Sequence, residues 1–104
     1  MDIHVNVINQ RLKISRNIKS VVAGSNKFVR FVFHLSDDWN GLTTTVKFIQ
    51  NGSEYTTDLD EGNSVYLPNE IIAGDFTIGI RGIDSDRIAT TSPITMHAYS
   101  PGKE

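Results

Sequence analysis

The chain has 104 residues, 10 Lys and Arg against 12 Asp and Glu, a formal net charge of −2 and no cysteine. This length suits one domain around one core, and the weak negative charge does not attract nucleic acid. The lack of cysteine excludes disulfide frameworks, cysteine–zinc sites and thiol catalysis. No apolar stretch approaches the roughly 20 residues that span a bilayer, and the first 20 residues lack the apolar run of a signal peptide. We therefore expect one soluble domain with neither a nucleic-acid partner nor a membrane partner.

Apolar and polar residues alternate in the first third of the chain, as in half-buried strands. The runs are "DIHVNV" at 2–7, "RLKIS" at 11–15 and "KFVRFVFHL" at 27–35. In the third run one face carries Val29, Phe31, Phe33 and Leu35, and the other carries Phe28, Arg30, Val32 and His34. We expect the first of these faces to enter the core.

An acidic hinge, "SDDWNGL" at 36–42, follows the third run and contains the only tryptophan. The ring of a lone Trp can cap the end of a core while its N–H reaches a turn carbonyl or water. We therefore assign structural roles to Trp39, Gly41 and Leu42, in a bend where Trp39 closes the open end of the domain above Leu42. Stacking of Trp39 on a ligand is the alternative.

The second half continues the alternation in "TVKFIQ" at 45–50, "EYTTDL" at 54–59, "SVYLP" at 64–68, "GDFTIGIRG" at 74–82 and "PITMHAYS" at 93–100. Asn51-Gly52 predicts a two-residue hairpin, because both central positions of a type I′ turn need positive φ. Turns at 60–64, 73–75 and 84–86 are expected to close further hairpins, which predicts a meander over about residues 44–82. Only "PNEII" at 68–72 could form a helical turn.

These features predict an all-β fold, an antiparallel β-sandwich of immunoglobulin-like or jelly-roll-like type. We expect about eight short strands and at most one short helical turn. The sandwich should occupy residues 1–99, with residues 100–104 as a C-terminal tail or linker.

The residues that could carry chemistry are scattered. His4, His34 and His97 lie on different predicted strands, with no second ligand at helical or hairpin spacing, so only tertiary proximity could assemble a metal or catalytic site. No serine lies in a G-x-S-x-G elbow, and no glycine-rich phosphate loop precedes a helix. We expect no catalytic, metal-binding or cofactor-binding residues, and hence no enzyme.

Aromatic residues suggest one alternative function. Carbohydrate-binding sandwiches display Trp and Tyr on an open face, and the candidates here are Trp39, Tyr55, Tyr66 and Tyr99. A glycan-binding module predicts that at least two of them lie coplanar on one exposed face.

Most of the chain, from about residue 20 to 98, resembles the N-terminal domain of upper baseplate proteins from phages and prophages of Gram-positive bacteria. The resemblance depends on a small residue, glycine and serine before the long strand, an acidic Trp hinge, and a later aromatic–apolar–Pro segment. The corresponding residues are Gly24-Ser25, Ser36 to Leu42, Phe48, Leu59-Asp60-Glu61, Tyr66-Leu67-Pro68 and "FTIGIRG" at 76–82.

The resemblance implies a structural domain of the virion, made in the bacterial host cytoplasm, that docks onto other tail or baseplate proteins and helps attach the host-recognition apparatus. It implies no catalytic residues. Such domains generally precede a helical trimer-forming segment, whereas only "SPGKE" follows Tyr99 here. A partner surface would need a sheet edge or an apolar patch, and the outward residues Phe28, Val32 and Ile49 are our candidates. A homo-oligomer is an open alternative.

Overall fold

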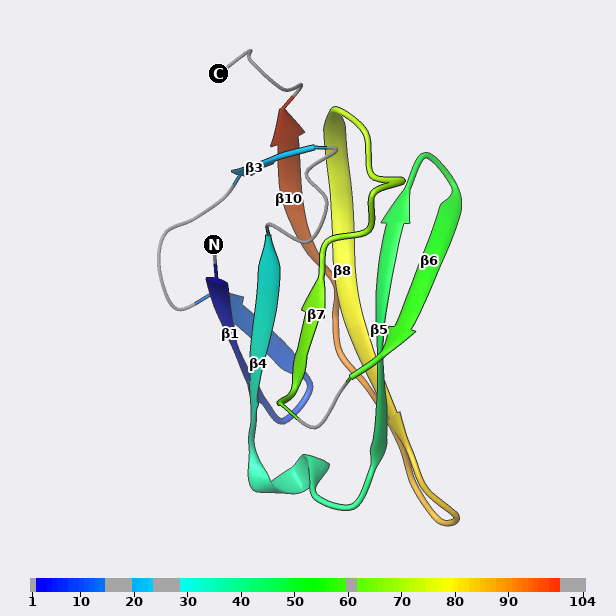
Figure 1. The fold of residues 1–104 in the computed structure, drawn as a ribbon. Coiled ribbons are helices and arrows are strands. Elements are labelled where there is room, and N and C mark those ends of the chain that lie inside the picture. The colour runs from blue at the N-terminus through cyan, green and yellow to red at the C-terminus, as the bar shows by residue number, and fades with distance from the viewer. Residues whose placement is uncertain (1, 15–19, 24–28, 60–61, 100–104) are drawn as a thin grey trace.

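The computed structural model describes residues 2–14, 20–23, 29–59 and 62–99, which form two β-sheets facing each other in a sandwich-like arrangement (Figure 1). The four-stranded sheet has the order β2 (Arg11–Ile14), β1 (Asp2–Ile8), β4 (Arg30–Leu35) and β7 (Ser64–Tyr66). The six-stranded sheet has the order β3 (Ser20–Val22), β10 (Ile94–Tyr99), β8 (Gly74–Ile83), β5 (Thr43–Gln50) and β6 (Ser53–Asp58). A short strand, β9 (Ile88–Thr90), also pairs with β8.

The core lies between the two sheets and consists of the inward-facing residues of the alternating strands. The ring of Phe31 on β4 meets that of Phe48 on β5 at a centroid distance of 5.7 Å, which joins the two sheets. Phe48 in turn meets Phe76 of β8 at 6.5 Å. Most of the expected inward residues are buried, namely Ile3, Val5, Val7, Val29, Phe31, Phe33, Val46, Phe48, Val65, Leu67, Phe76, Ile78, Ile80, Met96 and Ala98. Leu35 and Ile94, which were also expected to point inward, are half-buried against this core. The all-β fold and the inward faces of these runs are therefore confirmed.

The expectation of a purely antiparallel sandwich is wrong, because both sheets are mixed. β1 pairs with β4 in parallel, with Ile3 opposite Phe31, and β10 pairs with β3 in parallel. After β2 the chain contributes β3 to the six-stranded sheet before β4 returns beside β1, and such a long connection permits parallel pairing. Alternation within a strand reports which face is buried and says nothing about the direction of its neighbour.

The predicted hairpin at Asn51-Gly52 is confirmed, since β5 and β6 are antiparallel neighbours and the two residues have φ of 52° and 81°. The predicted meander over residues 44–82 is wrong. β7 crosses to the other sheet and pairs with β4, and the chain then returns as β8 to pair with β5. Residues 60–61 of the first expected turn lie outside the described residues, but β6 and β7, on either side of it, belong to different sheets. Residues 67–73 likewise connect β7 to a strand of the other sheet, whereas the expected turn at 84–86 does close a hairpin between β8 and β9.

The described residues form ten strands where about eight were expected. The additional strands, β3 and β9, are three residues each, too short for alternation to reveal. The only helical turn among the described residues is η1 (Asp37–Trp39), a 3-10 turn in the acidic hinge, and not the "PNEII" segment. That segment makes one hydrogen-bonded turn, in which the Ile71 N–H donates to the Pro68 carbonyl at 3.2 Å, without continuing as a helix. The buried side chain of Gln50 holds its end: Nε2 donates to the carbonyl of Ile72 at 2.7 Å, and Oε1 accepts from the Ile72 N–H at 2.8 Å.

Candidate functional site

A groove of about 610 Å³ lies on the side of the sandwich where β6 of one sheet faces β7 of the other. In Figure 1 these strands lie at the outer edges of their sheets. The groove contains a stretch of β6, all of β7 and the segment that follows β7. Its lining residues are Tyr55, Thr56, Thr57, Asp58, Ser64, Val65, Tyr66, Leu67, Pro68, Asn69 and Glu70.

The free edge of β6 offers hydrogen-bonding groups to solvent. In the described structure β6 pairs only with β5, through the two-residue turn that joins Gln50 and Ser53. Antiparallel pairs alternate between hydrogen-bonded and non-bonded types, and the pair that closes a two-residue turn is bonded. The backbone N–H and C=O groups of Glu54, Thr56 and Asp58 therefore point away from β5. Such a row is a template for one more strand.

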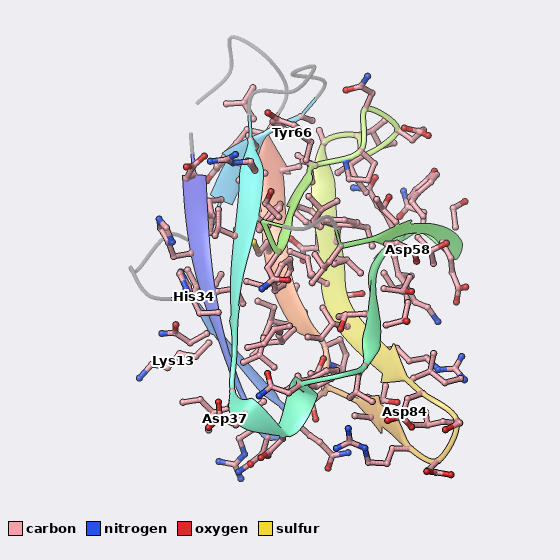
Figure 2. The ribbon with its side chains drawn as sticks, turned by 60° about the horizontal axis from the view of Figure 1, so that its bottom comes forward. Lys13, His34, Asp37, Asp58, Tyr66 and Asp84 are labelled. Carbon is pink, nitrogen blue, oxygen red and sulfur yellow. The ribbon has the colours of Figure 1, made fainter. Side chains whose placement is uncertain are left out.

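Two tyrosines approach the groove from different sheets. Tyr55 is half-buried opposite Phe48, at the margin of the core, whereas Tyr66 on β7 is 44% exposed. Figure 2 shows Tyr66 near one end of the molecule, with Asp58 on a neighbouring flank. Tyr99 lies elsewhere, on β10, where its ring meets that of His97 edge-on at 4.6 Å.

The groove has an acidic character. Asp58 and Glu70 contribute carboxylates, and no Lys or Arg is among its described lining residues. The Oδ1 of Asp58 accepts a hydrogen bond of 2.8 Å from the hydroxyl of Thr45, its partner on β5, which orients the carboxylate toward β5. The groove therefore complements a cation or a basic segment better than an anion.

The end of the sandwich that contains the acidic hinge is closed. Trp39 in η1 is 3% exposed, and its Nε1 donates to the carbonyl of Asn9 in the β1–β2 turn at 2.8 Å. A Cβ on Gly82 of β8 would lie 2.9 Å from both Leu42 and the Trp39 ring, so this glycine makes room for both side chains. Gly41 has a φ of +82°, which permits the bend between Trp39 and Leu42. The contribution of Trp39, Gly41 and Leu42 to the free energy of unfolding stays a prediction.

The contacts of Arg87 and of the Asn9 carbonyl at this closed end could not be predicted from the sequence. The guanidinium of Arg87 donates to the carbonyls of Asp38 at 3.4 Å and Asn40 at 3.0 Å, which ties the β8–β9 hairpin to η1. No local sequence signal marks the carbonyl of Asn9 or the reach of Arg87. Gly82 did carry a signal, since a glycine at an inward position of a strand often marks a close approach.

The sequence-based partner candidates do not form one surface. Val32 and Ile49 are both half-buried, but Val32 lies on the outer face of the four-stranded sheet and Ile49 on that of the six-stranded sheet. Ile49 borders a small hollow of about 170 Å³ beside Gly79, together with Lys47 and Arg81. Phe28 lies outside the described residues. The β6 edge was not singled out from the sequence, because edge position depends on which strands pair.

The histidines are less scattered than the sequence indicated. The Nδ1 of His4 lies 2.8 Å from the Nε2 of His34, on the adjacent strands β1 and β4. The Nδ1 of His97 lies 2.9 Å from a carboxylate oxygen of Asp75. Within the described residues no three His, Cys, Asp or Glu side chains gather as a metal site.

Comparisons with known proteins add no assignment. No family model matches the chain, and neither the curated proteins nor the solved structures contain a significant match. The part of the chain that the structure describes has no helix with the length and apolar character needed to cross a membrane.

Proposed function

We propose that this chain is a non-enzymatic assembly domain of a phage or prophage tail baseplate, located in the virion and helping to attach the host-recognition apparatus. The sequence resemblance supports the class of protein. The observation that carries the docking role is the β6 edge, whose outward backbone groups border an acidic groove.

The partner that fits this site is an extended, basic segment of a neighbouring tail protein. Its backbone would pair with Glu54, Thr56 and Asp58 of β6, since an added strand gains main-chain hydrogen bonds at an open edge. Its Lys or Arg side chains would reach the carboxylates of Asp58 and Glu70, and its apolar side chains would contact Tyr55 and Tyr66.

The charge of the groove can be tested with two matched substitutions. Glu70→Lys reverses a charge in the groove, and Asp37→Lys makes the same change at an exposed position in η1. Binding to purified neighbouring tail proteins is measured for each variant by biolayer interferometry at two salt concentrations. We expect Glu70→Lys to weaken binding by about tenfold, within the range of a close charge pair, and Asp37→Lys to leave it unchanged. Equal effects of the two variants would argue against the groove.

Glycan binding is the second candidate, because Tyr55 and Tyr66 line the same groove. Trp39 is withdrawn from this role, since it is buried, and Tyr99 lies against His97 instead. Stacking on the two tyrosines, with hydrogen bonds to Asp58 and Glu70, would be the mode of binding. A glycan array separates the candidates: a signal that Tyr66→Ala removes favours the sugar, and an array without signal eliminates it.

A further inference from the structure

The imidazoles of His4 and His34 lie together on the outer face of the four-stranded sheet. β1 and β4 run in parallel, with His4 opposite Val32 and Asn6 opposite His34. Their neighbours Ile3, Val5 and Phe33 point into the core, so alternation turns both imidazoles outward. Figure 2 shows His34 on this outer side. Both residues are exposed, and their ring planes are 18° apart with centroids separated by 5.1 Å.

We propose that His4 and His34 form a binding site for a borderline divalent transition metal, Cu²⁺, Ni²⁺ or Zn²⁺. Neutral imidazole is a ligand that suits these three metals. Two nitrogens that bind one metal at about 2.0–2.1 Å with an angle of about 90–110° are about 2.9–3.4 Å apart. The separation of 2.8 Å between His4 Nδ1 and His34 Nε2 is close to that range. In the present contact the two ring nitrogens point at each other. Each ring must therefore turn by about 35–45° to aim its lone pair at one ion, a change that rotation about χ1 and χ2 of two exposed side chains can supply.

Metal binding replaces the present contact between the rings. A contact of 2.8 Å between two ring nitrogens implies that one carries hydrogen and the other accepts it. To bind a metal, the donor ring takes the tautomer that carries hydrogen on its other nitrogen, so a neutral pair releases no proton.

The chemistry of this face selects against hard cations. Its nearest carboxylate in the β1–β4 register, Asp2, is paired with Arg30 at 2.8 Å. Lys13, opposite Asn6 on β2, adds a positive charge to the same face. Ca²⁺ and Mg²⁺ require several oxygen ligands, and the described residues do not gather such a set on this face. With two protein ligands and water in the remaining positions, the affinity should follow the order of nitrogen sites, with Cu²⁺ bound most tightly.

The third histidine provides a matched control. His97 is held against Asp75 at 2.9 Å, and its ring also contacts Tyr99. His97 offers a metal one imidazole, whereas the proposed site offers two. His97→Ala therefore removes the same chemical group from the protein and leaves the site intact.

The experiment is a calorimetric titration of the untagged 104-residue chain with CuCl₂, NiCl₂, ZnCl₂ and CaCl₂ at pH 7.5. We expect one copper site per chain, weaker nickel and zinc binding, and no calcium binding. His4→Ala and His34→Ala should each weaken copper binding about tenfold or more, because the second imidazole acts at a high effective concentration. His97→Ala should bind as the wild type does.

His34→Ala is the most informative variant, because it leaves the N-terminal segment unchanged. It therefore distinguishes copper bound by the His4–His34 pair from copper bound by the N-terminal residues alone. Circular dichroism confirms that each variant is folded, and His34→Gln serves as a second substitution. The electron paramagnetic resonance spectrum of bound Cu²⁺ should show coupling to two imidazole nitrogens, reduced to one in His34→Ala. Wild-type copper affinity in His34→Ala, loss of binding in His97→Ala, or no copper binding by the wild type would overturn the proposal.

Discussion

The hinge end of the sandwich is closed by packed and hydrogen-bonded side chains, whereas the groove side leaves one strand edge unpaired in the described structure. At the hinge end, Trp39 and Leu42 lie against Gly82, and the tryptophan N–H and the Arg87 guanidinium donate to backbone carbonyls. Along the groove, β6 leaves a row of backbone groups without a neighbouring strand in the described structure. Figure 2 shows Asp37 and Asp84 toward one end, away from Tyr66.

This difference separates residues that stabilise the fold from those that are free to bind. Buried polar groups are satisfied at the hinge end, and the described structure has no buried side-chain N or O atom without a hydrogen-bond partner. An open strand edge adds little to stability and carries a risk of unwanted pairing. An open β6 edge beside an acidic groove is expected if another chain covers that edge.

The largest expected effect is at Trp39. Trp39→Ala should lower the free energy of unfolding by about 3–5 kcal/mol, because it leaves a cavity and removes the hydrogen bond to Asn9. Urea melts followed by circular dichroism measure this change. Trp39→Phe keeps most of the ring volume and should lose less. Unchanged stability of Trp39→Ala together with lost partner binding would mean that the hinge is a binding site.

Gly82→Ala should come next. The added Cβ would lie 2.9 Å from carbons of Leu42 and Trp39, so overpacking should cost about 1–3 kcal/mol. Gly79→Ala is the matched control on the same strand, since its Cβ would meet only the Thr91 hydroxyl, at 3.9 Å. Thermal or urea melts should show Gly79→Ala at or slightly above wild-type stability. Two equally destabilised variants would contradict the close packing at Gly82.

Proline substitutions on β6 address the other side of the comparison. Thr56→Pro removes an outward N–H, so it should abolish strand addition by the partner and leave the β5–β6 ladder intact. Thr57→Pro removes an N–H that faces β5, so it should destabilise the fold by at least about 1 kcal/mol. Binding assays and urea melts on both variants test this separation. Full partner binding by a folded Thr56→Pro protein would exclude pairing at this edge.

The smallest effect concerns pH. The backbone N–H groups of Asp86 and Arg87, together with the Arg87 guanidinium, hold the pKa of Asp84 below its ordinary value of 3.8. The unfolded chain then binds the proton first, so the contribution of Asp84 is present above pH 3.8 and is lost as pH falls toward the lowered pKa.

Asp84→Asn should therefore reduce the loss of stability below pH 4, as measured by urea melts at several pH values. Asp86→Asn removes the same charge two residues away and serves as the control. Identical acid dependence in the wild type and Asp84→Asn would show that this carboxylate does not contribute.

Local patterns were sufficient for most strands and their buried faces, but not for the short strands β3 and β9 or for the pairing of strands into sheets. Alternation identified Phe31, Phe48 and Phe76 as core residues, and Asn51-Gly52 identified its hairpin. The parallel pairing of β1 with β4 and the transfer of β7 to the other sheet depend on contacts between distant segments, which leave no periodic trace.

The same limit applies to the candidate sites. Tyr55 and Tyr66 were recognised as aromatic candidates, but only the tertiary fold places them on one groove. His4 and His34 are 30 residues apart in the sequence and become neighbours through parallel pairing. Trp39 was easier to assign, because a lone tryptophan in an acidic, glycine-containing bend has few other ways to bury its ring.

Amide hydrogen exchange on β6, with and without purified neighbouring tail proteins, tests the docking account most directly. In the free protein, the amides of Glu54, Thr56 and Asp58 should exchange quickly, while those of Tyr55 and Thr57 are protected by β5. Addition of the tail protein that we propose as the partner should slow exchange at the first three positions. Protection that appears at Asp37–Trp39 instead, with the β6 amides still exchanging quickly in the complex, would contradict docking through this edge.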